Sequence, residues 1–133
     1  MSLAVVDASV LTAFYVSDDA RRARVASRLT AGDALFAPAH IDAEVGSALR
    51  GLARVSRTVD RTAVRALEHL AGFPLRRMPI APLLARMWQL RANITACDAT
   101  YVALAEQLGC VVVTLDAKLA SATGPRCPID LID

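Results

Sequence analysis

The feature that most constrains the fold is an alternation of short apolar runs with longer stretches whose apolar residues recur at helical spacing. The short runs are typical of buried strands, and they cover residues 3–6, 34–37, 75–78, 111–114 and 129–132. Between them we expect helices over residues 10–16, 20–30, 41–57, 62–70, 81–91 and 98–108, and a short helix after Asp116. This order favours an α/β fold with a mostly parallel sheet of about four or five strands flanked by about seven helices.

The whole chain, residues 1–133, is expected to form one domain. A chain of 133 residues buries enough apolar surface to fold without disulfides or a structural metal. The sequence contains no repeat, linker or low-complexity segment that would mark a boundary. Gly72 and Gly109 each follow a predicted helix, where glycine commonly ends one.

The sequence is rich in apolar residues, but their distribution does not indicate a membrane protein. Hydrophobic residues make up 55% of the chain and its mean hydropathy is +0.41. A membrane-spanning helix needs roughly 18 or more uninterrupted apolar residues, and no window comes near that length. The first predicted strand begins at Leu3, which leaves no room for a secretion signal. We therefore expect a cytoplasmic protein that starts at Met1 and does not contact a membrane.

The three cysteines do not form a recognisable metal or disulfide pattern. Cys97, Cys110 and Cys127 contain no C-x-x-C pair, and their odd number leaves one without a partner. The two histidines, His40 and His69, lie far from them in the sequence, so a zinc site is disfavoured. We expect reduced cysteines that are mostly buried.

Arginine is distributed unevenly, although the net charge of the chain is only +2. Such a small charge does not by itself indicate a nucleic-acid-binding protein. Two interpretations of the arginines stay open: a solvated helix face, and a surface that contacts RNA phosphates. The residues form an early cluster and a helically spaced series, namely Arg21, Arg22, Arg24 and Arg28, then Arg50, Arg54, Arg57, Arg61 and Arg65.

Two aspartates follow well-formed apolar runs. Asp7 comes directly after residues 3–6, and Asp116 comes two residues after residues 111–114. Ligands of open parallel sheets bind at the carboxyl ends of the strands, so both side chains are expected at that edge. A structural explanation is also open for each, as turn chemistry for Asp7 and as a helix N-cap for Asp116. Ser9 could cap the following helix or add a hydroxyl to the same site.

Two further acids are expected near helix starts. Glu44 lies in a first turn, where the helix dipole favours a carboxylate, yet a carboxylate on the apolar face needs a cationic partner. Asp98 stands three residues after Thr95, a spacing that resembles a capping box. The residues after Asp98 are strongly apolar, so Asp98 is expected at the rim of the core.

Each of these acids has a structural explanation, but together they indicate metal chemistry. Carboxylates that gather at one sheet edge repel one another. A hard divalent cation with oxygen ligands would offset this repulsion, and no cysteine or histidine competes for the role. We therefore predict that Asp7, Glu44, Asp98 and Asp116 bind Mg²⁺, with Mn²⁺ as a substitute.

Four segments of the chain resemble the PIN-domain family, and within it the VapC-like toxins of type II toxin–antitoxin systems. The segments are VVDAS at 5–9, DAEV at 42–45, ITACDATYVALA at 94–105 and VTLDAKL at 113–119. The resemblance extends over essentially the whole chain. The segments follow one another in the order usual for the family, and the chain has the usual size. One departure is Cys97, because an aromatic residue commonly precedes the acid in this family.

The resemblance implies a PIN-like fold and a Mg²⁺-dependent endoribonuclease. Asp7, Asp98 and Asp116 would hold one or two metal ions, and Glu44 would complete the shell through water or orient the nucleophile. Water attack does not use the ribose 2′-hydroxyl, so the products should carry a 5′-phosphate and a 3′-hydroxyl. Thr114 and Asn93 resemble polar residues that flank the site of the family.

The resemblance also implies partners for the chain. These are an RNA substrate such as tRNA, a second copy of the chain, and a small VapB-like antitoxin whose C-terminal segment packs into an apolar groove. Val10, Leu11 and Phe14 are candidates for that groove, although core packing is the favoured use for most of them. Arg50, Arg54 and Arg57 are candidate contacts for the RNA backbone.

Three other functions compete with a nuclease. A catalytically inactive PIN-like interaction module is the main alternative, and the presence of all four carboxylates favours the enzyme over it. A phosphorylatable receiver domain needs adjacent acids after the first strand, but Asp7 is followed by Ala8. A haloacid-dehalogenase-type phosphatase would have aspartate at the position of Ser9.

Overall fold

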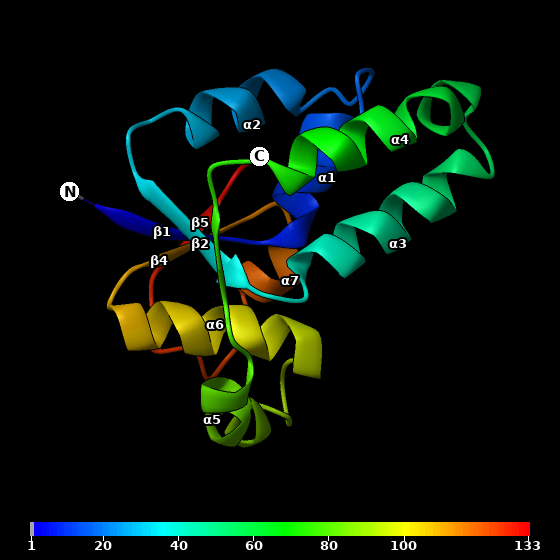
Figure 1. Cartoon of the computed structure of the whole chain (residues 1–133). Helices are drawn as coiled ribbons and strands as arrows, with labels where there is room; N and C mark the ends of the chain where they lie inside the picture. The colour runs from blue at the N-terminus through cyan, green and yellow to red at the C-terminus, as the bar shows by residue number, and fades with distance from the viewer. Residues whose placement is uncertain (1) are drawn as a thin grey trace.

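The computed structural model describes residues 2–133, and its centre is a five-stranded parallel sheet. The strands lie in the order β3-β2-β1-β4-β5, so that β1 is the middle strand and pairs with β2 and β4 (Figure 1). They are β1 (Leu3–Val6), β2 (Ala34–Pro38), β3 (Arg76–Met78), β4 (Val111–Thr114) and β5 (Ile129–Leu131). All five predicted strands are present, and β1 and β4 have the predicted bounds.

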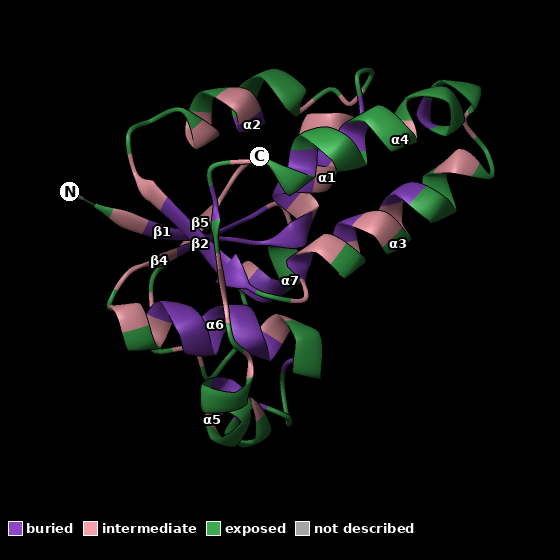
Figure 2. Cartoon of the chain, viewed as in Figure 1, coloured by how far each residue is buried: buried purple, intermediate pink, exposed green. Residues whose placement is uncertain are grey.

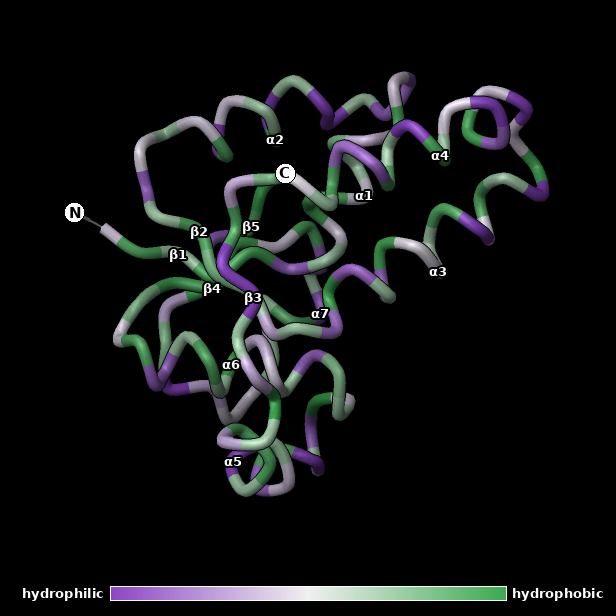
Figure 3. Tube along the Cα trace, viewed as in Figure 1, coloured by the Kyte–Doolittle hydropathy of each residue, from purple (hydrophilic) through white to green (hydrophobic). Residues whose placement is uncertain are grey.

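Strands β1 and β4 are apolar along their length because helices cover both faces of the sheet. Val5 and Val6 in β1 and Val112 and Val113 in β4 are at most 1% exposed. Parallel strands that are buried on both faces have continuous apolar sequences rather than alternating apolar and polar residues. Figure 2 shows the buried residues gathered in these strands and in α6, and Figure 3 shows that the same strands are hydrophobic.

The helices form two layers around the sheet. Helix α6 packs against β1, β2 and β4 with α5 outside it, while α1 and α2 lie over the other face (Figure 1). α3 and α4 form a hairpin that projects beyond the sheet. The helices are α1 (Ala8–Tyr15), α2 (Arg22–Leu29), α3 (Ile41–Ala53), α4 (Arg57–Ala71), η1 (Ala81–Leu83, a 3₁₀ helix), α5 (Leu84–Gln89), α6 (Ala96–Leu108) and α7 (Ala117–Ala120). Within residues 2–133, none is both long and apolar enough to cross a membrane.

The boundary between α3 and α4 differs from the prediction. We expected one helix over residues 41–57 and a second from residue 62, but α3 ends at Ala53 and α4 begins at Arg57. Ser56 is the N-cap of α4, because its side-chain oxygen accepts a hydrogen bond from the backbone N–H of Val59 at 3.2 Å. A serine cap satisfies an amide that has no partner within the helix, and it therefore starts α4 earlier than apolar spacing suggests.

The cysteines are free, as predicted, but their burial was overestimated. Cys97 is exposed in the first turn of α6, and Cys110 and Cys127 are partly buried.

Candidate active site

The four predicted acids line one cavity at the carboxyl edge of the sheet. β1 and β4 are neighbouring parallel strands, so Asp7 after one lies near Asp116 after the other. Glu44 and Asp98 reach the same edge from the first turns of α3 and α6. The cavity has a volume of about 490 Å³, and all four carboxylates contribute to its lining.

Asp7 is the most buried of the four, with 5% of its surface exposed. Its Oδ2 accepts hydrogen bonds from the hydroxyls of Thr114 at 2.7 Å and of Ser9 at 3.0 Å. Burial raises the pKa of Asp7, and the two hydroxyl donors oppose this rise because they stabilise the charged form. Both hydroxyls reach the same oxygen, which leaves lone pairs of Oδ1 for another partner.

The same two hydroxyls also connect separate segments of backbone. Ser9 Oγ accepts a hydrogen bond from the backbone N–H of Leu115 at 3.1 Å, and Thr114 Oγ1 accepts one from the N–H of Asp116 at 3.0 Å. The Ser9 hydroxyl therefore links the start of α1 to the turn after β4, and the Thr114 hydroxyl links the end of β1 to the same turn. Ser9 and Thr114 occupy the supporting positions that the sequence predicted for them.

Glu44 is held by two side chains that motif spacing did not reveal. The Tyr101 hydroxyl donates a hydrogen bond to Glu44 Oε1 at 2.6 Å, and His40 Nδ1 lies 2.7 Å from the same oxygen without the alignment of a hydrogen bond. Burial and the negative charge of Glu44 raise the pKa of Tyr101, so it stays a donor. Spacing offered a signal for each, since His40 precedes Glu44 by four residues and Tyr101 follows Asp98 by three.

His40 also contacts Thr100 on α6. The Thr100 hydroxyl donates to the backbone oxygen of Cys97 at 2.6 Å, so its oxygen is left to accept from His40 Nε2 at 2.6 Å. The other ring nitrogen, Nδ1, faces Glu44. His40 therefore joins the start of α3 to α6 beside Glu44.

Asp98 shows the repulsion expected among gathered carboxylates. Burial raises its pKa first, and the charges of Asp7, Asp116 and Glu44 raise it further, while Thr95 lowers it. The other three acids contribute to this shift of the Asp98 pKa, and all four line the same cavity. Their shared cavity is the arrangement on which the predicted metal site depends.

The structural explanations for Asp98 and Asp116 hold as well. Thr95 is the N-cap of α6 and accepts from the backbone N–H of Asp98 at 3.3 Å. Asp116 is the N-cap of α7, and its Oδ1 accepts from the N–H of Lys118 at 2.9 Å. A cap uses only part of a carboxylate, so capping and cavity lining are compatible.

The donor set fits a hard cation that keeps part of its water shell. Four carboxylates supply only oxygen ligands, which Mg²⁺ and Mn²⁺ prefer. Within residues 2–133, no three acidic, histidine or cysteine side chains lie close enough together to hold a metal ion by themselves. Mg²⁺ usually retains several waters and takes one or two protein carboxylates, so an open arrangement suits it.

The cavity also contains residues that the sequence analysis did not assign to the site. Asp19 and Arg21 line it from the turn before α2, and Thr12 lines it from α1. Arg21 was noted only as part of an arginine cluster. The fold of the loop between α1 and α2 decides that Arg21, rather than its neighbours, reaches the cavity.

Two groups of predicted residues lie outside the cavity lining. Asn93 does not flank the acids, because its side-chain amide donates to the backbone oxygen of Thr123 at 3.0 Å in an exposed position. Arg50 is exposed on α3, Arg54 in the connection that follows, and Arg57 at the start of α4. Their role as RNA contacts stays a prediction.

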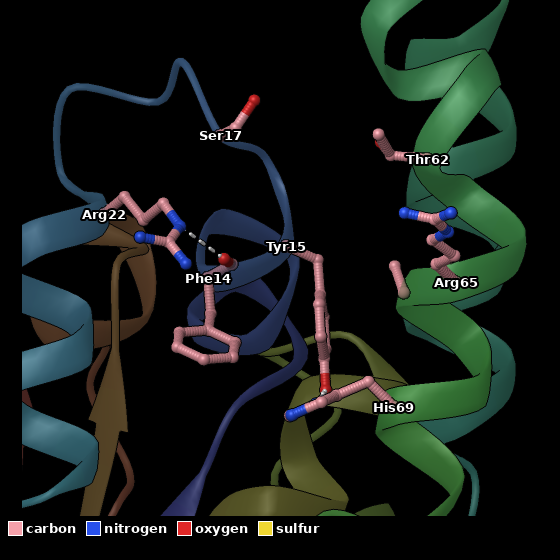
Figure 4. A pocket seen from close by; sticks show the side chains of 8 residues that line it. Phe14, Tyr15, Ser17, Arg22, Thr62, Arg65 and His69 are labelled. Atoms are coloured by element: carbon pink, nitrogen blue, oxygen red, sulfur yellow. Dashed lines mark hydrogen bonds between the residues drawn. The ribbon is translucent and has the colours of Figure 1, made fainter.

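A second cavity of about 340 Å³ lies between α1, α2 and α4 (Figure 4). Its lining combines aromatic and cationic side chains, including Phe14, Tyr15, Arg22, Arg65 and His69. The Tyr15 hydroxyl lies 2.7 Å from Nδ1 of His69, and this hydrogen bond joins α1 to α4. Arg22 donates to the backbone oxygen of Phe14 at 2.9 Å.

Comparison with known families and sequences gives a match over most of the chain. The family model described as PIN domain matches residues 4–125. VapC ribonuclease Mb0985 of Mycobacterium bovis is 38% identical over 128 residues, which cover 96% of this chain and 97% of that protein. The similarity therefore extends through all the elements that carry the four acids.

Solved structures share the fold at lower sequence identity. VapC20 of Mycobacterium tuberculosis, described as a Sarcin-Ricin loop cleaving toxin, has a TM-score of 0.71 at 19% identity, covering 89% of this chain and 93% of that one. VapBC2 of Rickettsia felis, solved with a DNA fragment from its promoter, has a TM-score of 0.68 at 12% identity, covering 98% and 99%. At these identities the likeness concerns the fold.

Proposed function

The chain belongs to the PIN domain family, and we propose that it is a metal-dependent endoribonuclease of the VapC type, the toxin of a toxin–antitoxin pair. The observation that carries this proposal is the shared cavity of Asp7, Glu44, Asp98 and Asp116. The near full-length similarity to a protein named as a VapC ribonuclease supports the same activity. The presence of all four acids argues against an inactive interaction module.

The side chains have separate roles in this proposal. Asp7, Asp98 and Asp116 would hold Mg²⁺, and Glu44 would complete the site through water or orient the attacking water. A bound Mg²⁺ lowers the pKa of water and offsets the charge that grows on the phosphate. Ser9 and Thr114 keep the Asp7 carboxylate in place through hydrogen bonds to its Oδ2. Hydrolysis by water leaves a 5′-phosphate and a 3′-hydroxyl.

Cleavage of RNA by the purified chain tests the activity. We expect total tRNA to be cut with Mg²⁺ present and to stay intact with EDTA. Asp98→Asn should lower the rate at least about 100-fold while the protein stays folded, because an amide is a poor substitute for an anionic metal ligand. Asp60→Asn, at an exposed acid of α4 outside the cavity, is the matched control. Full activity of Asp98→Asn, or products with 2′,3′-cyclic ends, would contradict the proposal.

The proposed protein partner is a VapB-like antitoxin seated in the cavity between α1, α2 and α4. Val10 and Leu11 cannot form its groove, because both are fully buried in the core. Phe14 remains in the lining, and Arg22 and Arg65 add positive charge that suits an acidic amphipathic segment (Figure 4). A basic side chain of the antitoxin would then reach the acidic cavity. Charge reversal of Arg65 to Glu should weaken complex formation, measured by co-purification with the antitoxin.

Assembly and substrate complete the proposal. We propose a homodimer, to be checked by light scattering of the purified chain across concentrations. RNA as substrate places the activity in the cytoplasm, and structured RNAs such as tRNA are the first candidates. Sequencing of cleavage ends after induced expression would identify the RNA.

A further inference from the structure

We infer that Arg21 binds a phosphate of the RNA next to the scissile one, and that Asp19 fixes the Arg21 guanidinium for this contact. The inference rests on the proposed ribonuclease function and adds a substrate-binding residue to it. It depends on where Arg21 lies, on how its side chain is held, and on which of its N–H groups remain free.

Arg21 is the single cationic residue of the active-site lining within the described part of the chain. The four acids occupy one part of the cavity, and Arg21 and Asp19 line it from the turn before α2. Apolar residues of α1 and α3, including Ala13, Val16 and Ala48, line the same space. An RNA strand with one phosphate at the acids would therefore place a neighbouring phosphate toward the only guanidinium in the cavity.

Asp19 holds Arg21 through three hydrogen bonds. Its Oδ1 accepts from the backbone N–H of Arg21 at 2.8 Å and from Nε at 3.1 Å, and its Oδ2 accepts from Nη2 at 3.0 Å. Both oxygens of Asp19 are therefore occupied, so this fifth acid of the cavity belongs to Arg21 rather than to the metal site. The paired geometry fixes the plane of the guanidinium.

The free donors of Arg21 suit a phosphate. Asp19 uses the Nε–H and one N–H of Nη2, which leaves the Nη1 group and the second N–H of Nη2. The Arg21 side chain keeps 43% of its surface exposed, whereas Asp19 keeps 17%. The partner that fixes the guanidinium is thus mostly covered, and the donors remain accessible from the cavity.

The neighbouring arginines have other uses. Arg22 donates to the backbone oxygen of Phe14, and Arg28 pairs with Asp33 and Asp130 at 2.7 Å each. Arg24 is exposed on α2 and does not line the cavity. An exposed ion pair contributes little to stability, so a stabilising role alone does not explain the geometry of Arg21.

Cleavage kinetics with a defined RNA test the inference. The probe is a fluorescein-labelled RNA that spans the main site cut by the wild-type chain in total tRNA. Arg21→Gln should raise KM about tenfold and leave kcat within about twofold, because a charge-assisted contact outside the reacting atoms is lost. The slope of log KM against the logarithm of the salt concentration should be smaller than that of wild type by about 0.7. This is the value for one phosphate contact on a single strand. Arg24→Gln is the matched control and should change neither.

Asp19→Asn separates positioning from simple charge. Removal of a negative charge from the cavity would by itself strengthen RNA binding, but loss of the fixed guanidinium should weaken it. We expect KM to rise severalfold in Asp19→Asn, and a lowered KM would overturn the positioning role. Thermal melting of both variants checks that the loop remains folded.

A neutral substrate analogue identifies the phosphate. Methylphosphonate at the contacted position should raise KM for wild type and cause no further rise in Arg21→Gln. An Arg21→Gln variant with wild-type KM and salt dependence would overturn this inference while leaving the proposed function intact. A wild-type chain that cuts no RNA would instead overturn both.

Discussion

At the scale of single residues, neutral donors hold the carboxylates of the cavity in place. Ser9 and Thr114 donate to Asp7, and Tyr101 donates to Glu44. Among residues 2–133, no arginine or lysine side chain forms an ion pair with the four acids. A hydroxyl fixes a carboxylate without cancelling its charge, so the charge remains available to a cation.

Replacement of Tyr101 by Phe tests this arrangement. Tyr101→Phe removes only the hydroxyl that orients Glu44, so we expect the cleavage rate to fall about tenfold, as for other residues that orient metal ligands. Loss of one buried hydrogen bond should lower the free energy of unfolding by about 1 kcal/mol. The measurement is single-turnover cleavage together with urea unfolding.

Tyr15→Phe is the control for this experiment. It also removes a tyrosine hydroxyl with a hydrogen-bond partner, but its partner is His69 and both residues lie outside the active-site lining. Cleavage by Tyr15→Phe should match wild type. Equal loss of activity in both variants would mean that Tyr101 acts through general packing.

The pH dependence of stability should show the repulsion among the acids. Burial and three neighbouring carboxylates raise the pKa of Asp98 above its ordinary value of 3.8. A raised carboxyl pKa means that the folded state binds the proton more tightly, so stability is retained below that ordinary value and is lost as pH rises through the folded pKa. Between pH 3 and pH 7, the free energy of unfolding of metal-free wild type should therefore fall relative to that of Asp98→Asn, measured by urea unfolding of both proteins. Identical pH profiles would contradict it.

At the scale of elements, α6 is the helix that carries most of the site. It supplies Asp98 and Tyr101, and its centre packs against three strands. Thr95 starts the helix as N-cap, and Gly109 ends it in the left-handed conformation with a φ of 67°. These two ends fix the length and position of α6, and hence the place of Asp98 at the cavity.

Two glycines that both follow helices give contrasting expectations. Gly109→Ala should lower the free energy of unfolding by about 1 kcal/mol, because a side chain disfavours a positive φ. Gly72 follows α4 with a φ of −102°, and the nearest atom to an added Cβ would be His69 O at 4.0 Å. Gly72→Ala should therefore be neutral or slightly stabilising in the same unfolding assay. A larger loss of unfolding free energy in Gly72→Ala than in Gly109→Ala would contradict the assigned cap geometries.

At the scale of the whole molecule, the site exists only in the folded state. Its acids come from β1, α3, α6 and the turn after β4, which are distant in the chain and meet at one edge of the sheet. A cation that binds this arrangement and not the unfolded chain stabilises the fold in proportion to its occupancy. Folding stability thus reports metal binding independently of cleavage.

Addition of Mg²⁺ should therefore raise the melting temperature. At ten times the dissociation constant, binding adds about 1.4 kcal/mol, which corresponds to about 4 °C for a domain of this size. Asp7→Asn and Asp98→Asn should show a much smaller shift, measured by scanning calorimetry. A shift that is equal in wild type and both variants would place the bound cation elsewhere.

The sequence by itself predicted the layered α/β fold and the four acids that line one cavity in the structure. Continuous apolar runs predicted the parallel strands, and β1 and β4 have the bounds that were predicted. Asp7 and Asp116 could be placed at the sheet edge because both follow strands of the same sheet. Local pattern suffices for such features. A run of consecutive apolar residues is the signature of a strand that is buried on both faces, and in a parallel sheet the carboxyl ends of the strands lie at the same edge.

Only the tertiary structure decided which polar side chains join the acids. His40, Tyr101 and Arg21 contact or line the site, whereas Asn93 turns toward another loop. The start of α4 is a different case, because its cap at Ser56 is a local hydrogen bond that apolar spacing did not reveal. For the side chains of the site, the physical reason is that hydrogen bonds are short and directional, so their partners depend on the packing of elements far apart in the sequence.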